Sequence, residues 1–295
     1  MRTYRETDVQ RRYPGITLFC VGLLLWLVPN VAAAHHPSGG ESAQPLHRVQ
    51  ADWRVGEFEL EGEAGRWLIL GLTGEAALLD WLSIRMDLPT VRATFDHHAS
   101  VVGLGNLELG LRFLALRTER DRVRLLFEVG SEFPTRTDPV LGAEHFELGG
   151  GAFLQVRLVD ELFANLALRY WASLSSDGAH THDHSAGTPW HPHADPPLVF
   201  PHAAQEGSVT LGLRLRTSFG SVGLTGDLIY GFAEPAGLGP VSVGLDSELT
   251  LAPGWTLFGG VSLPVAGELR SLWSTRLGLR FAFGSEPPPS CGCGH

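Results

Sequence analysis

The chain has 295 residues, of which 44% are hydrophobic and 18% are charged, and its net charge is −10 at neutral pH. The charged fraction lies below the roughly 25% typical of soluble domains, and all 22 basic residues are arginines. The hydrophobic content excludes an intrinsically disordered chain. The acidic balance excludes a basic nucleic-acid-binding protein, so we expect no nucleic-acid partner.

The first 34 residues have the pattern of a secretory signal peptide. Arg11 and Arg12 precede an apolar run, 16–28, and 32–34 are alanines that provide a cleavage site. The run is shorter than the roughly 20 residues of a transmembrane helix, so we expect cleavage after Ala34 rather than a membrane anchor. Cleavage removes four of the 22 arginines and two of the 32 acidic residues, which changes the net charge to −12.

Twelve later segments alternate apolar and polar residues with a period of two. This period predicts β-strands with one apolar face and one polar face. Most segments are about ten residues long, the length that a tilted strand needs to cross a bilayer. The segments are 53–62, 67–77, 81–91, 104–116, 123–134, 145–158, 163–174, 207–218, 222–232, 240–251, 256–264 and 271–283.

The connections between these segments differ at the two ends of the expected sheet. Five are tight: 78–80, 118–122, 159–162, 219–221 and 252–255. Five are generally longer: 92–103, 135–144, 175–206, 233–239 and 265–270. Short periplasmic turns opposite longer external loops are typical of outer-membrane barrels.

We therefore predict an all-β fold, a transmembrane antiparallel up-and-down β-barrel of about 12 strands of the outer-membrane type. The barrel covers 53–283, with a periplasmic segment at 35–52 and a periplasmic tail at 284–295. The alternative is a secreted β-sandwich, which also alternates apolar and polar residues. Strand length, loop asymmetry and the aromatic-ended last strand favour the barrel, whose partners would be outer-membrane lipid and the barrel-assembly machinery.

A barrel explains both faces of the strands, because the apolar face contacts lipid and the charged face lines the lumen. The predicted lumen residues are Arg85, Asp87, Glu108, Arg112, Glu128, Arg157, Arg169, Arg214, Arg216, Asp246, Glu248 and Arg280. Tryptophans near the strand ends are expected either in interfacial belts or packed inward. A lumen of opposed arginines and carboxylates would select solutes passively, by size and charge.

One part of the chain resembles a known family. Residues 103–113, GLGNLELGLRF, resemble the GLGDLxLGLKY segment of a family of bacterial outer-membrane barrels linked to the meta-pathway of phenol degradation or described as transporter-like. Phe133-Pro134-Thr135 is similar to the family's PTG loop, with Arg136 in place of the glycine, and the likeness covers about 67–174. It implies a transport-type barrel, for aromatic or hydrophobic compounds.

Histidines gather in one expected external loop, 175–206. Neutral imidazoles and carboxylates suit zinc, copper or nickel ions, and such tracts are typical of metal binding. The alternative is a solvated loop with no specific role, and no cofactor is required. The candidate ligands are His180, His182, Asp183, His184, His191, His193 and His202, with His97 and His98 in a second loop.

The C-terminal tail offers a separate set of soft ligands, Cys291, Cys293 and His295. Two thiolates and an imidazole suit Cu(I) or Zn(II), with His35 and His36 on the same side of the membrane. In an oxidising periplasm the cysteines can instead form a disulfide or pair with another protein. A disordered extension is the remaining alternative.

The sequence holds no metalloprotease, nucleophile-elbow or P-loop motif, and we expect no enzymatic activity. The preferred function is an outer-membrane channel or transporter for small solutes, either metal ions or small aromatic or hydrophobic compounds, with metal-binding loops. The alternative is a metal-binding or metal-sensing surface protein that transports nothing.

Overall fold

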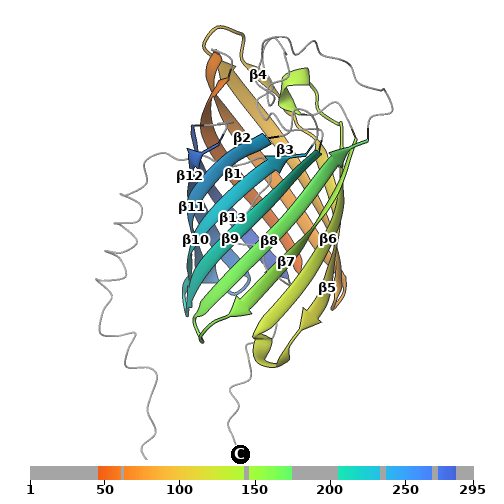
Figure 1. Ribbon diagram of the computed structural model, residues 1–295, viewed down its shortest axis with the longest axis vertical. Helices are drawn as coiled ribbons and strands as arrows, with labels where there is room; N and C mark the ends of the chain where they lie inside the picture. The colour runs from red at the N-terminus through yellow and green to blue at the C-terminus, as the bar shows by residue number, and fades with distance from the viewer. Residues whose placement is uncertain are drawn as a thin grey trace, which may run out of the picture. The chain divides into compact units, whose positions relative to one another are not determined.

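The computed structural model describes residues 46–60, 63–142, 146–174, 205–232, 237–267 and 272–283, which form a closed antiparallel β-barrel (Figure 1). Its strands are β1 (His47–Leu60), β2 (Glu63–Leu79), β3 (Leu82–Phe95), β4 (Val101–Leu104), β5 (Leu107–Arg117), β6 (Val123–Phe133), β7 (Glu147–Arg157), β8 (Leu162–Ser173), β9 (Gln205–Thr217), β10 (Gly220–Gly231), β11 (Gly237–Ala252), β12 (Trp255–Ala266) and β13 (Trp273–Phe283). Two short 3₁₀ turns are η2 (Glu119–Asp121) and η3 (Pro139–Leu141).

The ring closes because β1 pairs with both β2 and β13. Twelve strands make the circuit, since the short β4 and then β5 pair with successive parts of β3. The predicted fold, an antiparallel barrel of about twelve strands, is confirmed. Among the described residues, no helix has the length and hydropathy to cross a membrane.

Many strand ends extend a few residues beyond the prediction, and three differences bear on the lumen. The first strand begins at His47, so 47–52 belongs to the barrel rather than to the N-terminal segment. The ninth strand begins at Gln205, two residues inside the expected loop. The single strand expected at 104–116 is divided at Gly105 and Asn106 into β4 and β5. Opposite this break lies Pro89, which has no N–H to donate to a ladder, and its carbonyl accepts a bond from Gly105 N at 3.0 Å.

The outer surface of the barrel is apolar. Leu211 in the middle of β9 is 60% exposed, and similar leucines and valines occupy the outward face of the other strands. Trp81 and Trp255 are exposed near the tight turns, while Tyr170 and Tyr230 are exposed near the longer loops. Closure of the sheet satisfies the backbone hydrogen bonds that lipid cannot.

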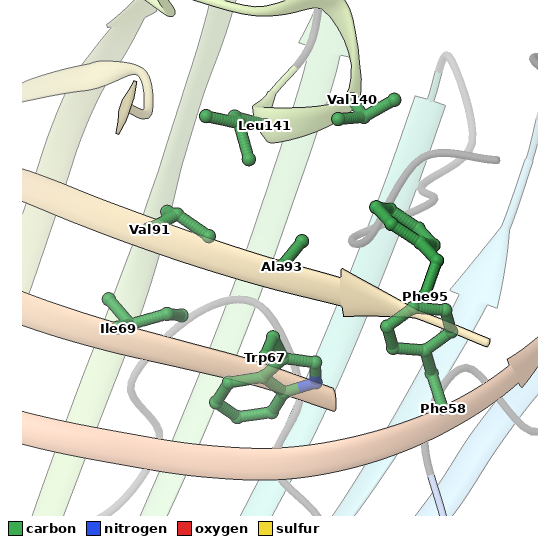
Figure 2. Packing of buried hydrophobic residues seen from close by; sticks show 8 residues of the cluster. All are labelled: Phe58, Trp67, Ile69, Val91, Ala93, Phe95, Val140 and Leu141. Atoms are coloured by element: carbon green, nitrogen blue, oxygen red, sulfur yellow. The ribbon is translucent and has the colours of Figure 1, made fainter. Parts of the chain in front are cut away.

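The inward face at the loop end of β1, β2 and β3 is also apolar, where a charged lining was expected. Figure 2 shows six side chains from these strands meeting Val140 and Leu141 of η3, and all eight are buried. The cluster consists of Phe58, Trp67, Ile69, Val91, Ala93, Phe95, Val140 and Leu141. Burying a side chain such as Leu141 contributes about 1.5–3 kcal/mol relative to exposure. The loop after β6 is therefore packed onto the barrel's loop end.

Polar contacts hold the same loop against β4 and β5. The buried Asn106 donates to Glu132 at 2.8 Å and accepts from the Arg136 backbone at 3.3 Å. Thr135 Oγ1 accepts from Leu107 N, and Thr137 Oγ1 accepts from Leu104 N, both at 2.9 Å. These contacts give a structural role to Asn106 and Thr135, two residues of the segments that resemble the family motifs.

Candidate functional site

The lumen wall contains all twelve charged residues predicted to line it, each buried or half-buried on the inward face of its strand. In β5, for example, Glu108 and Arg112 alternate with the outward Leu109 and Leu111. Eight of the twelve form ion pairs with residues in the described part of the chain. These ion pairs form two main networks.

The first network surrounds Glu75 of β2. Its carboxylate lies 2.8 Å from Arg48 and 2.9 Å from Arg112, and it accepts a hydrogen bond from Ser83 at 2.7 Å. Arg112 is 0% exposed and also lies 3.5 Å from Glu128. The sequence interpretation missed Arg48 and Glu75. The signal for Arg48 was present, because 48–55 alternates polar and apolar residues.

The second network joins β1 to β13 and β11. Asp52 pairs with Arg54 at 2.6 Å and with Arg276 at 3.1 Å. Glu248 lies 2.9 Å from Arg280 and 3.4 Å from Arg214, which also pairs with Asp246. Ion pairs inside the lumen thus connect four strands, β1, β9, β11 and β13.

A row of carboxylates crosses the wall from β3 to β7. Asp87 lies opposite Glu108 in the sheet, and Glu108 lies opposite Glu132 on its other side. Glu132 in turn lies opposite Glu147. Adjacent like charges destabilise a sheet, and polar groups offset the repulsion: Arg85 lies 2.6 Å from Asp87, and Asn106 donates to Glu132. No local pattern in the sequence predicted this row, because it depends on strand register.

Three phenylalanines on the inward face of the barrel each contact the guanidinium groups of two arginines. Phe258 contacts Arg276 and Arg280, Phe153 contacts Arg112 and Arg169, and Phe163 contacts Arg157 and Arg216. The distances from guanidinium carbon to ring centroid run from 4.2 to 5.9 Å, which is the range of cation–π contacts. These aromatic side chains lie in the lumen, where the period of two alone would have placed only polar groups.

A cavity of about 370 Å³ lies inside the barrel beside β7–β13. Its lining includes Phe153, Gln155, Asn165, Arg169, Arg214 and Arg216. A second gap of about 10 Å³ lies between Arg85, Glu108, Phe153 and Arg169. That gap holds no more than about one water molecule.

The predicted metal ligands are placed only in part. His97 and His98 are adjacent in the exposed bend after β3, and the ring of His98 packs edge-on to Phe95. The other candidate ligands, in 180–202 and 291–295, lie outside the described residues. Within the part of the chain that the structure describes, no group of three or more histidines, cysteines or carboxylates is arranged to hold a metal ion.

The turn between β5 and β6 carries an ion pair outside the barrel wall. Asp121 Oδ1 accepts from Arg117 Nε at 2.5 Å, and Arg124 lies 3.0 Å from the other oxygen. The hydrogen bond from Arg117 is the largest effect on Asp121 and, with that from Arg124, lowers its pKa to about 2. The carboxylate therefore stays ionised at neutral pH and holds Arg124 at the turn end of the lumen.

Comparisons with known proteins support the fold. No protein-family model matches the sequence, and no curated protein matches it. An outer-membrane channel from Pseudomonas putida F1 is 13% identical, with a TM-score of 0.62 over 84% of this chain and 99% of the channel. The NanC porin is 9% identical, with a TM-score of 0.50 over 80% of this chain and 100% of the porin. At these identities the likeness establishes a shared barrel fold.

Proposed function

We propose that the chain is an outer-membrane channel through which small organic solutes pass passively. One observation carries this proposal: the lumen holds a cavity of about 370 Å³, inside a barrel whose outer surface is apolar. Cavities of this size accommodate small organic ligands. The barrel likeness to an outer-membrane channel and a porin supports the same function and location.

The lumen chemistry favours organic solutes over metal ions. Arginines such as Arg169 and Arg216 line the cavity and would repel a cation, whereas Phe153 offers an apolar ring. A solute with both polar and apolar parts fits this lining, and the resemblance to the phenol-degradation family points to the same class.

The alternative is a metal-binding surface protein that transports nothing. The packing of η3 against the loop end of β1–β3 favours it, because this loop narrows the external mouth. In that case the histidines at 180–202 would bind zinc, copper or nickel ions at the cell surface. The tail cysteines would serve a periplasmic partner.

Liposome swelling with the folded full-length protein separates the two functions. A channel admits small neutral sugars and aromatic alcohols at rates that fall with solute size. A variant lacking 175–204, which keeps all of β9, should retain this flux. Absence of swelling, together with metal binding that the deletion abolishes, would refute the channel and support the alternative. Recovery of the protein from cells without detergent would contradict the outer-membrane location.

A further inference from the structure

The ring of Phe163 contacts two arginines near the turn end of the lumen. Arg216 of β9 has its guanidinium carbon 4.2 Å from the ring centroid, and Arg157 of β7 has its own at 5.6 Å. Phe163 is buried on the inward face of β8. The two guanidiniums therefore place two positive charges beside one buried ring.

These two arginines differ from the two that contact Phe258. Beside Phe258, Arg276 pairs with Asp52 at 3.1 Å and Arg280 pairs with Glu248 at 2.9 Å. Among the described residues, neither Arg157 nor Arg216 forms an ion pair with a carboxylate. Arg157 Nε is buried and has no hydrogen-bond acceptor within the same part of the chain, an exception to the usual pairing of buried polar atoms.

Most of the charged groups around Arg216 are also positive. Arg124, Arg157 and Arg214 all repel Arg216, and Glu248 attracts it. Glu248 is already engaged by Arg280 and Arg214. The turn end of β6, β7 and β9 is therefore a region of excess positive charge inside a barrel, where an anion is the group that would stabilise it.

The same region opens into the cavity. Arg214 and Arg216 line it, together with Gln155 and Asn165, whose side chains bond to each other at 3.0 Å. A planar guanidinium binds a carboxylate through two parallel hydrogen bonds and stacks on flat groups. The Phe153 ring, which also lines the cavity, offers an apolar contact.

We propose that Arg157, Phe163 and Arg216 form a binding site for a small organic carboxylate, which occupies the adjoining cavity. Arg216, which lines the cavity, contacts the carboxylate directly. Arg157 packs on the same ring and adds its positive charge to the site. If the protein is the channel proposed above, small organic carboxylates are the solutes that it carries. Binding of a carboxylate at this site does not depend on that function.

Isothermal titration calorimetry on the detergent-solubilised full-length protein tests the site with sodium benzoate as the probe. Benzamide, which has the same ring and no charge, is the matched ligand. The variants are Arg216→Gln and Arg157→Gln, and the control is Arg276→Gln, which also removes an arginine from a phenylalanine ring. Heat-modifiable migration in gels confirms that each variant is a folded barrel.

We expect saturable benzoate binding that weakens about tenfold or more in R216Q, as for the loss of a charged hydrogen-bond pair. R157Q should weaken it about threefold, while R276Q should change it less than twofold. Equal weakening in R276Q, equal binding of benzamide, or no benzoate binding by the folded protein would overturn the site. Benzoate binding by a protein that shows no liposome flux would overturn the channel and leave the site standing.

Discussion

Replacing Arg112 by methionine tests whether the lumen network stabilises the barrel. Arg112 is 0% exposed and lies 2.9 Å from Glu75 and 3.5 Å from Glu128. Removing one partner of a buried ion pair costs about 3–5 kcal/mol, because the other charge stays buried. Here Arg48 remains 2.8 Å from Glu75, and Arg85 remains 3.9 Å from Glu128. We therefore expect the lower end, about 3 kcal/mol.

The measurement is reversible urea unfolding of the full-length protein in liposomes, with the free energy taken by linear extrapolation. Arg66→Met is the control, because Arg66 is 73% exposed in its 2.7 Å pair with Glu57, and such pairs contribute about 0–1 kcal/mol. The reasoning is refuted if R112M unfolds within about 1 kcal/mol of R66M. That result would mean that water in the lumen screens the network as effectively as it screens the surface.

Three further predictions follow from the outer wall, the loop and the turn. Leu211→Arg, at the middle of β9, should lower the free energy of unfolding by about 2–4 kcal/mol. Leu251→Arg, at the turn end of β11, should lower it by only about 0–1 kcal/mol. Equal losses for the two variants, measured by unfolding in liposomes, would contradict the lipid-facing assignment. Asn106→Ala removes the bonds to Glu132 and the Arg136 backbone, so liposome swelling by small sugars should rise several-fold, and unchanged rates would show that the loop does not restrict entry. The pKa of Asp121 is lowered from 3.8 to about 2 in the folded protein. The ionised carboxylate therefore contributes its full stabilisation of the fold above the pKa of the unfolded chain. This contribution is lost as the pH falls through the pKa of the folded protein. The stability difference between wild type and D121N should then be constant from about pH 5 upward and shrink between about pH 4 and pH 2, whereas loss near pH 6 would exclude this carboxylate as the cause.

The strands and their faces could be predicted because a barrel wall has two environments and a strand alternates between them. In β5 the pattern around Leu111 and Arg112 identifies both faces without knowledge of any partner. The start of β1 was missed although the same alternation runs through 48–55. The break between β4 and β5 was missed because its cause, Pro89, lies on the neighbouring strand.

The contacts inside the lumen could not be predicted in the same way. A period of two shows that Arg112 faces inward, but its pairing with Glu75 requires the register of β2, β3 and β5. Nothing local marks Val140 and Leu141 as buried, since they follow a proline in a loop of mixed composition. Their burial depends on the apolar inward face that three strands present together at the loop end.

Strand direction combined with register also explains how the lumen separates charge along its axis. On β6, β7 and β9, inward carboxylates lie near the loop end and inward arginines lie near the turn end. The carboxylates are Glu132, Glu147 and Glu206, and the arginines are Arg124, Arg157 and Arg216. Around the seam of β1, β11 and β13, opposite charges are neighbours and cancel locally. A solute in the lumen therefore meets a neutral wall on one side and a polarised wall on the other. Because the loop-end carboxylates repel an anion and the turn-end arginines attract it, an anionic group would be held at the turn end of the barrel, beside Phe163.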